Sequence, residues 1–352
     1  MYSLIFFILF IGPFIIERIA DLLHLKQAAL PLPEALDSLQ KPDDHDKAFQ
    51  YASLRTRNTW FSESTHLVLF TVFWALGGFP YLATFAESFG TSPMIAGLIF
   101  TFSLLLLQFI LGIPFSYYST FVIEEKFGFN RTTKKLFVQD LFKALLLSVI
   151  LGVLVLSAAY WLLGKMGENA AIPLFSMYAA FQIIVLFIAP VLILPLFLKL
   201  TPLDDGDAKT AIEAYRAKHP FKLNGVWVCD ASKRSAKSNA FFTGFGKFRR
   251  LVLFDTLLKS QNPSELTAIV AHEAGHFVKN HIIRGIVMGF VITFVFLFGT
   301  VAIVHSSFLY RFFGFTEWMM ESHLQQGDVP WRLHAPGENV GDLCERQVAK
   351  TA

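Results

Sequence analysis

Six long apolar stretches run through this sequence, and they restrict the chain to a fold that crosses a membrane. They lie at residues 2–20, 65–88, 94–118, 142–163, 172–199 and 284–310. Each is near the roughly 20 residues that a helix needs to cross the hydrocarbon core of a bilayer. Hydrophobic residues make up 54% of the chain and charged residues only 16%, an apolar surplus that a soluble core of this length could not hide. The sequence therefore predicts an all-α polytopic membrane protein with about six transmembrane helices.

The first apolar stretch has a second interpretation, because an N-terminal apolar segment can be a cleaved signal peptide. No basic region precedes residues 2–20, and no Ala-x-Ala-like cleavage site follows them cleanly. A basic leading region and such a cleavage site are both typical of signal peptides. We therefore expect this stretch to remain in the protein as a membrane span.

The basic residues are spread unevenly over the loops, which predicts the orientation of the spans. Six basic residues lie in and beside the loop between the first two stretches, from Arg18 to Arg57, and five lie in and beside the loop between the third and fourth, from Lys126 to Lys143, whereas residues 89–93 hold none. Because Lys and Arg concentrate in cytoplasmic loops, we expect the first, third and fifth loops in the cytoplasm and the N-terminus outside. The net charge of +3 comes without a sustained basic run, so no nucleic-acid partner is expected.

The fifth loop, residues 200–283, is the one long hydrophilic segment, and it predicts a small α+β region. A polar helix is expected at residues 208–218, and strands at residues 225–229 and 250–254. Asn262 precedes Pro263, with Glu265 three residues beyond the asparagine. This order is typical of a capped helix start, with proline at the first helical position.

The helix that starts there carries an H-E-x-x-H motif formed by His272, Glu273 and His276. Residues four apart share one face of a helix, so the two histidines can bind one metal ion with the glutamate beside it. Zinc peptidases use two such imidazoles, a third protein ligand, and a bound water that the carboxylate deprotonates. A chance pair of surface histidines is the alternative, but the capped helix and small neighbours such as Ala274 and Gly275 favour a zinc site.

The chain is thus expected to have four parts. They are five transmembrane helices and their loops at 1–199, a cytoplasmic zinc-peptidase region at 200–283, a sixth transmembrane helix at 284–310, and an atypical polar tail at 311–352.

Three segments, at residues 121–133, 238–245 and 270–276, together resemble the CAAX prenyl protease 1 family of integral-membrane zinc endopeptidases. That resemblance implies membrane helices around a large chamber, with the zinc site on its cytoplasmic side. It also implies His272 and His276 as zinc ligands and Glu273 as the base that activates the zinc-bound water.

The resemblance further implies a substrate-binding segment beside the metal, where an extended peptide would add as a strand. Its residues are Asn239, Ala240, Phe241, Phe242 and Gly244. An ordinary edge strand is the alternative for this segment.

Other candidate residues are weaker. The loop-three residues Glu124, Glu125 and Lys126 could be functional, or they could belong to a solvated loop that anchors the chain at the membrane. His281 also occurs in the family, but on a continuous helix it would point about 140° away from His276, so a supporting or structural role is expected. The segment 204–206 faintly resembles the L-D-G motif of site-2 proteases, but it precedes the H-E-x-x-H motif instead of following it.

The family's third zinc ligand is a glutamate that follows a seventh membrane span, and this sequence shows neither. The tail holds four glutamates, none within a family motif: Glu317, Glu321, Glu338 and Glu345. The C-terminal part is therefore expected to be truncated or replaced. Because a site with two ligands binds zinc less tightly, low or absent peptidase activity is expected for this chain alone.

The sequence thus favours a membrane-embedded zinc metalloendopeptidase that hydrolyses peptide or protein substrates, prenylated ones included. It would be a multi-pass protein of a bacterial inner membrane or an endoplasmic-reticulum-type membrane. A non-catalytic membrane chamber that binds lipidated or unfolded peptides remains an alternative. A related heat-shock membrane protease is a third, although the five spans before the motif argue against it.

Overall fold

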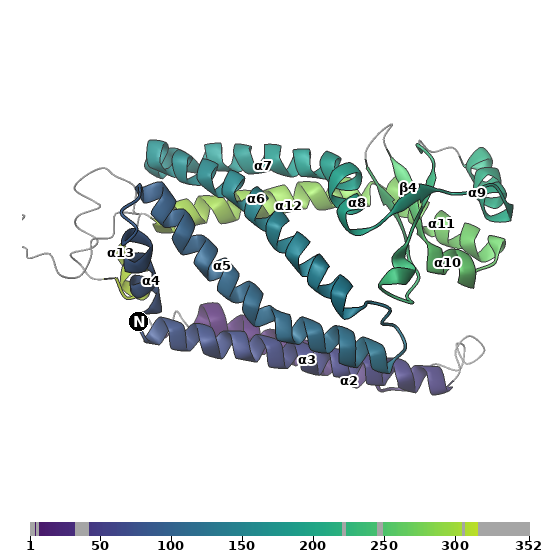
Figure 1. Ribbon diagram of the computed structural model, residues 1–352, viewed down its shortest axis with the longest axis horizontal. Helices are drawn as coiled ribbons and strands as arrows, with labels where there is room; N and C mark the ends of the chain where they lie inside the picture. Colours follow the sequence, from purple (N-terminus) through teal and green to yellow (C-terminus); the bar gives the residue numbers. More distant parts are fainter. Residues whose placement is uncertain are drawn as a thin grey trace, which may run out of the picture. The chain divides into compact units, whose positions relative to one another are not determined.

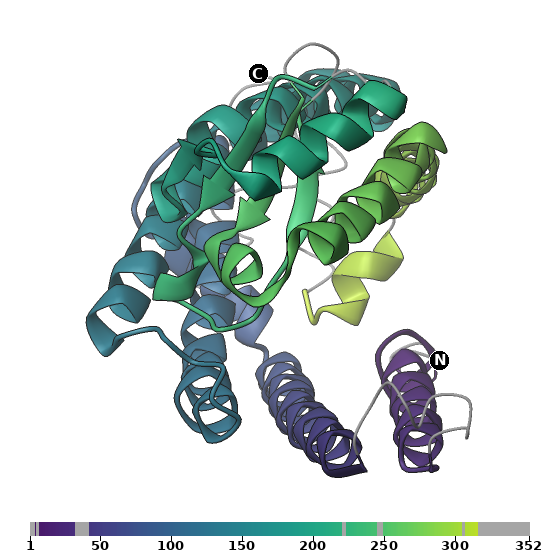
Figure 2. The ribbon, with the colours of Figure 1, turned by 90° about the vertical axis from the view of Figure 1, so that its right-hand side faces the viewer.

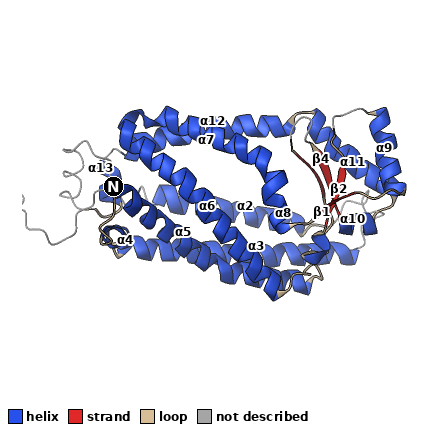
Figure 3. Cartoon of the chain, turned by 45° about the horizontal axis from the view of Figure 1, so that its top comes forward, coloured by secondary structure: helices blue, strands red, loops and turns tan. Residues whose placement is uncertain are grey.

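The computed structural model of the chain describes residues 4, 7–31, 42–219, 223–244, 249–304 and 307–315. These residues are mostly helical, and the few strands lie close together (Figure 3). The chain divides into two compact units. The first unit is built from residues 1–119, 149–170 and 299–352, and the second from residues 120–148 and 171–298.

The helices and strands follow one another along the colour gradient of the ribbon (Figure 1). The helices are α2 (Gly12–Ala28), α3 (Pro42–Ala75), α4 (Gly78–Glu87), α5 (Pro93–Tyr118), α6 (Lys134–Met166), α7 (Ala171–Ile188), α8 (Leu194–Phe197), α9 (Asp207–Lys218), α10 (Asp255–Ser260), α11 (Pro263–Val278), α12 (His281–Val304) and α13 (Ser307–Phe312). The strands are β1 (Leu200–Pro202), β2 (Val226–Cys229), β3 (Ala240–Thr243) and β4 (Arg250–Phe254).

Three helical stretches of the described chain are long and apolar enough to cross a membrane, or four if a bent pair counts as one span. They are Pro93–Glu124, Lys134–Phe197 and His281–Ile303. The second is 64 residues long and contains two predicted spans, because a short turn at Gly167–Ala170 separates α6 from α7. Large apolar side chains on these helices are exposed, as at Val295, which is 64% exposed. Lipid can cover such surfaces, whereas water would make them costly.

The predicted span at residues 65–88 is bent where it was expected to be continuous. Helices α3 and α4 meet at an angle of 71°, and Gly77 between them has a φ of 71°. Glycine adopts this left-handed conformation without steric cost, so the chain can turn there. The first predicted span, 2–20, lies only partly within the described residues, where it continues as α2.

The first unit is held together by aromatic and charged contacts between its helices. Trp74 donates an Nε1–H hydrogen bond to the carbonyl oxygen of Phe312 at 2.6 Å, and the two rings stack. Arg18 of α2 forms an ion pair with Glu63 of α3. Trp60 donates to Asp21 at 2.7 Å. These pairings bring opposite charges and hydrogen-bonding groups together, which lowers the cost of polar groups near hydrocarbon.

The second unit contains a four-stranded sheet, which Figure 2 shows among the helices of this unit. Its strand order is β1-β2-β4-β3. Strands β2 and β4 are parallel, whereas β1 and β3 pair antiparallel at the two edges. The predicted strands at 225–229 and 250–254 are confirmed as β2 and β4, and the predicted helix at 208–218 as α9.

Side chains alternate between the two faces of this sheet, as successive strand residues must. On one face, Leu251 and Leu253 pack with Ile212 of α9 and with Leu266 and Val270 of α11, all at most 1% exposed. On the other face, Val252 packs with Cys229 and Ala231. The sheet therefore holds α11 rigidly on one face and presents a separate surface on the other.

The buried thiol of Cys229 generates a prediction. Burial raises its pKa to about 11, because a thiolate is poorly solvated inside a protein. The folded state thus holds this proton to higher pH than the unfolded state does. The stability contributed by this difference is fully present below about pH 8.5, the ordinary thiol pKa, and is lost as the pH rises toward 11.

We therefore expect Cys229 to resist alkylation by iodoacetamide in the folded protein near neutral pH, and to react after denaturation. The experiment uses a Cys344→Ala background so that one thiol is counted by mass spectrometry. Rapid modification of the folded protein would show that the thiol is accessible.

Candidate metal and peptide site

Helix α11 carries the H-E-x-x-H motif. The start of this helix is fixed by the predicted capping arrangement. The Asn262 Oδ1 atom accepts hydrogen bonds from the backbone N–H groups of Ser264 and Glu265, each at 3.0 Å. Glu265 Oε2 in turn accepts one from the Asn262 N–H group at 2.9 Å. This reciprocal pair is a capping box, and the predicted helix start is confirmed.

The buried face of α11 determines where the motif points. Leu266 and Val270 are at most 1% exposed in the core against the sheet. Glu273, one turn further along this face, is half-buried, whereas His272 and His276 are exposed. The helix therefore keeps the proposed base partly shielded from water and leaves both imidazoles open to a ligand.

The two imidazoles converge on one point. The Nε2 atoms of His272 and His276 are 3.2 Å apart, and their ring centroids are 4.9 Å apart. Two nitrogens bound to one tetrahedral zinc at about 2.0–2.1 Å would be separated by about 3.3 Å. The donor set and its spacing thus fit two positions of a zinc site.

His281 lies beside this pair, contrary to the expectation for a continuous helix. Asn280 has a φ of 55°, which ends α11 and lets α12 start at His281 in a new direction. Asparagine tolerates this left-handed conformation better than most residues. As a result, the Nδ1 atoms of His276 and His281 are 2.9 Å apart, and the predicted 140° separation is wrong.

A third protein ligand is not found among the described residues. Within residues 4–315, apart from the gaps in the description, no three His, Cys, Asp or Glu side chains are grouped so that they could hold a metal ion. The glutamates considered as substitutes all lie outside the described residues: Glu317, Glu321, Glu338 and Glu345.

The predicted substrate segment forms β3, at the edge of the sheet next to α11. Within the described sheet β3 pairs only with β4. Ala240 and Phe242 face the core shared with α11, and Phe241 faces the opposite side. Asn239 precedes the strand and is exposed, and Gly244 follows it with a φ of 80°. The strand edge thus offers backbone groups that an extended peptide could pair with.

The loop-three segment has a structural role that the sequence did not reveal. The Glu124 carboxylate forms an ion pair at 2.9 Å with Lys237, which lies just before β3 in the sequence. Arg131 donates its backbone N–H to the carbonyl oxygen of Arg234 at 3.0 Å, and Glu125 accepts a hydrogen bond from Asn130. The first two contacts join loop three to the segment that leads into β3, and the third lies within loop three. The opposite charges of Glu124 and Lys237 allow an ion pair, but the two residues are 113 positions apart, so the sequence alone did not indicate that they meet.

Long apolar helices and a small sheet with an H-E-x-x-H helix are together typical of a membrane metallopeptidase. Two family profiles match the chain: "CAAX prenyl protease N-terminal, five membrane helices" over residues 21–199 and "Peptidase family M48" over residues 202–329. The chain belongs to the CAAX prenyl protease 1 group of this peptidase family, so the resemblance seen in the sequence is confirmed.

Individual relatives extend the match over most of the chain. The probable CAAX prenyl protease 1 of Schizosaccharomyces pombe is 36% identical over 324 residues, covering 87% of this chain and 68% of the relative. The homolog from Arabidopsis thaliana is 34% identical, covering 86% of this chain and 73% of the relative. The crystal structure of S. mikatae Ste24p superposes with a TM-score of 0.82 at 33% identity, covering 89% of this chain and 74% of that one. The predicted fold class, an all-α membrane protein with a small α+β catalytic region, is confirmed.

Proposed function

We propose that this chain is a zinc-dependent membrane endopeptidase in which His272 and His276 hold the metal and Glu273 is the catalytic base. The observation that carries the proposal is the 3.2 Å separation of the two Nε2 atoms on an exposed face of a rigidly packed helix. Membership of a peptidase family supports the reaction class.

The proposed chemistry divides between the metal and the protein. Zinc, when bound, supplies a Lewis acid that polarises a peptide carbonyl group and makes a water molecule more acidic. The Glu273 carboxylate can accept a proton from that water and deliver it to the nitrogen of the leaving amine. Glu273 is half-buried, and its helix packs against the sheet. Both features restrict the positions that the carboxylate can take.

The substrate is proposed to be a peptide that pairs with the edge of β3 opposite to β4, along Asn239, Ala240, Phe241, Phe242 and Gly244. Backbone pairing aligns an extended chain without reading its sequence, so the scissile carbonyl can lie next to α11. The relatives are CAAX prenyl proteases, and this favours prenylated proteins as substrates. A prenyl chain would lie among the apolar helices, where hydrocarbon is well solvated.

The catalytic loop is proposed to face the cytoplasm, since the loops rich in Lys and Arg are retained there. Exposed single cysteines at Lys259 and Thr91 test this in sealed cells with an impermeant maleimide, in a chain lacking Cys344. We expect Thr91→Cys to react from outside and Lys259→Cys to react only after the membrane is opened. The reverse pattern would invert the topology.

Substitutions in the motif should separate metal binding from turnover. Glu273→Gln should retain zinc and lower turnover of a prenylated peptide at least about 100-fold, because a positioned base contributes about that much. His272→Ala and His276→Ala should lose zinc as well. Zinc is measured by elemental analysis and chelator competition, with Glu213→Gln, an exposed carboxylate on α9, as the matched control.

These measurements also distinguish the alternative. A site with only His272 and His276 as protein ligands would bind zinc more weakly than a three-ligand site, and its turnover would be correspondingly slow. Stoichiometric zinc in the histidine variants would contradict the assigned ligands. Peptide binding without any hydrolysis by the zinc-loaded protein would favour a non-catalytic peptide-binding chamber.

His281 should act through His276. If His276 binds zinc by Nε2, its Nδ1–H group can donate a hydrogen bond to the unprotonated Nδ1 of His281, 2.9 Å away, and this bond would fix the ring. His281→Ala should therefore weaken zinc affinity about 10-fold or more, and His281→Asn, which keeps an acceptor, should restore part of it. An equal loss for exposed His219→Ala would contradict a specific role.

A further inference from the structure

A basic pocket lies within the second unit, on the sheet face opposite to α11. It has a volume of about 500 Å³. Trp227 and Arg250 line it from the face that also carries Val252 and Cys229, whereas the motif helix packs against the other face. The pocket is therefore separate from the proposed metal site.

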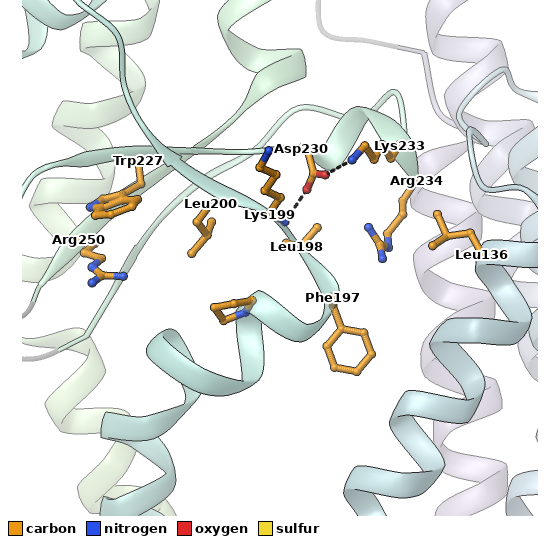
Figure 4. Close-up of a pocket in the computed structure, with 11 residues that line it drawn as sticks. Leu136, Phe197, Leu198, Lys199, Leu200, Trp227, Asp230, Lys233, Arg234 and Arg250 are labelled. Atoms are coloured by element: carbon orange, nitrogen blue, oxygen red, sulfur yellow. Dashed lines mark hydrogen bonds and ion pairs between the residues drawn. The ribbon is translucent and has the colours of Figure 1, made fainter.

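Four cationic side chains line this pocket, and one carboxylate accompanies them. The cations are Lys199, Lys233, Arg234 and Arg250, and the carboxylate is Asp230. In Figure 4, Arg250 and Trp227 lie on one side, Lys233 and Arg234 on the other, and Lys199 between them. This excess of positive charge attracts an anion.

Two of the cations already have partners within the second unit. Arg234 forms a two-pronged ion pair with Asp140, through Nε at 2.9 Å and Nη2 at 3.1 Å. Lys233 pairs with Asp230 at 2.7 Å. Asp230 is also occupied, because it accepts the backbone N–H of Lys199 at 2.7 Å. Burial works against ionisation of Asp230, but these hydrogen bonds outweigh it and the pKa of its carboxyl lies below the ordinary value.

The other two cations are available. Within the described residues, the Lys199 ammonium and the Arg250 guanidinium have no carboxylate at salt-bridge distance. The Arg250 guanidinium lies over the Trp227 ring, with its carbon 4.5 Å from the ring centroid. Stacking holds the guanidinium in one orientation while leaving its N–H groups free to bind a planar or tetrahedral anion.

The rest of the lining is apolar and belongs to the ends of membrane helices. Leu136 comes from the start of α6, and Pro195, Phe197 and Leu198 come from the end of α8 and the residue after it. The Lys143 ammonium of α6 donates to the Leu196 carbonyl oxygen at 2.9 Å, which ties these two helix ends together. Lys199 is the first Lys or Arg after the apolar stretch of α7 and α8.

We propose that this pocket binds the phosphate group of an anionic membrane lipid, with Lys199 and Arg250 as its principal ligands. The cations would bind the phosphate while the apolar helix ends contact the glycerol and the first part of the acyl chains. A lipid is favoured over a soluble phosphate because cationic and apolar surfaces meet where membrane helices end. Lipid phosphates are concentrated at that depth of a bilayer.

Binding of phosphatidic acid to the purified full-length chain tests the proposal, with phosphatidylcholine as the neutral comparison. Native mass spectrometry from detergent gives the dissociation constant for each lipid. Lys199→Gln should weaken phosphatidic acid binding about 5-fold, the effect expected for one basic residue near a phosphate. The double variant Lys199→Gln/Arg250→Gln should weaken it more than 10-fold. Lys199 is exposed, so the single variant remains informative if the double variant folds poorly.

The matched control is Lys218→Gln/Lys259→Gln, which also removes two positive charges from exposed positions outside the pocket and should bind phosphatidic acid normally. Glycerol phosphate provides the soluble arm. If it binds as tightly as the lipid and depends on the same residues, the phosphate site stands but the lipid source is overturned. Equal phosphatidic acid binding by wild type and double variant overturns the pocket as the site. An acidic peptide that binds through Lys199 and Arg250 while phosphatidic acid does not would identify a protein partner instead.

Discussion

Hydrogen bonding of the backbone inside hydrocarbon is the constraint on which the rest of this structure depends. No water reaches the bilayer core, so every N–H and C=O group must be satisfied within the segment that crosses it, and helices do this. Irregular backbone, strand edges and charged side chains are therefore concentrated in the polar segments. In this chain the sheet, the H-E-x-x-H motif and the cationic side chains of the basic pocket all belong to one such segment, residues 199–281, with helices of the same unit beside it.

Local signals in the sequence predicted what local physics determines. Apolar length predicted the spans, and the order Asn262, Pro263, Glu265 predicted the start of α11, because a capping box needs only neighbouring residues. The strands β2 and β4 followed from short runs of β-branched and aromatic residues. The two motif histidines were expected on one face, and their nitrogens are 3.2 Å apart.

Features that depend on distant residues or on one backbone conformation were not predictable in the same way. The 71° bend between α3 and α4 depends on a left-handed glycine, and helix periodicity does not report such a conformation. The pairing of Glu124 with Lys237 joins loops that are far apart in the sequence. His281 was misplaced because a continuous helix was assumed through Asn280. The roles of the motif residues, the part boundaries and the substrate segment stay predictions.

The left-handed conformation of Asn280 forms a very short junction between the motif helix and a membrane helix. Only Lys279 and Asn280 separate α11 from α12, and the imidazole next to His276 is the first residue of the membrane helix. A displacement of α12 at its junction would therefore be transmitted directly to the histidine pair instead of being absorbed by a loop. The position of α12 in the bilayer therefore also determines the position of His281 relative to His276.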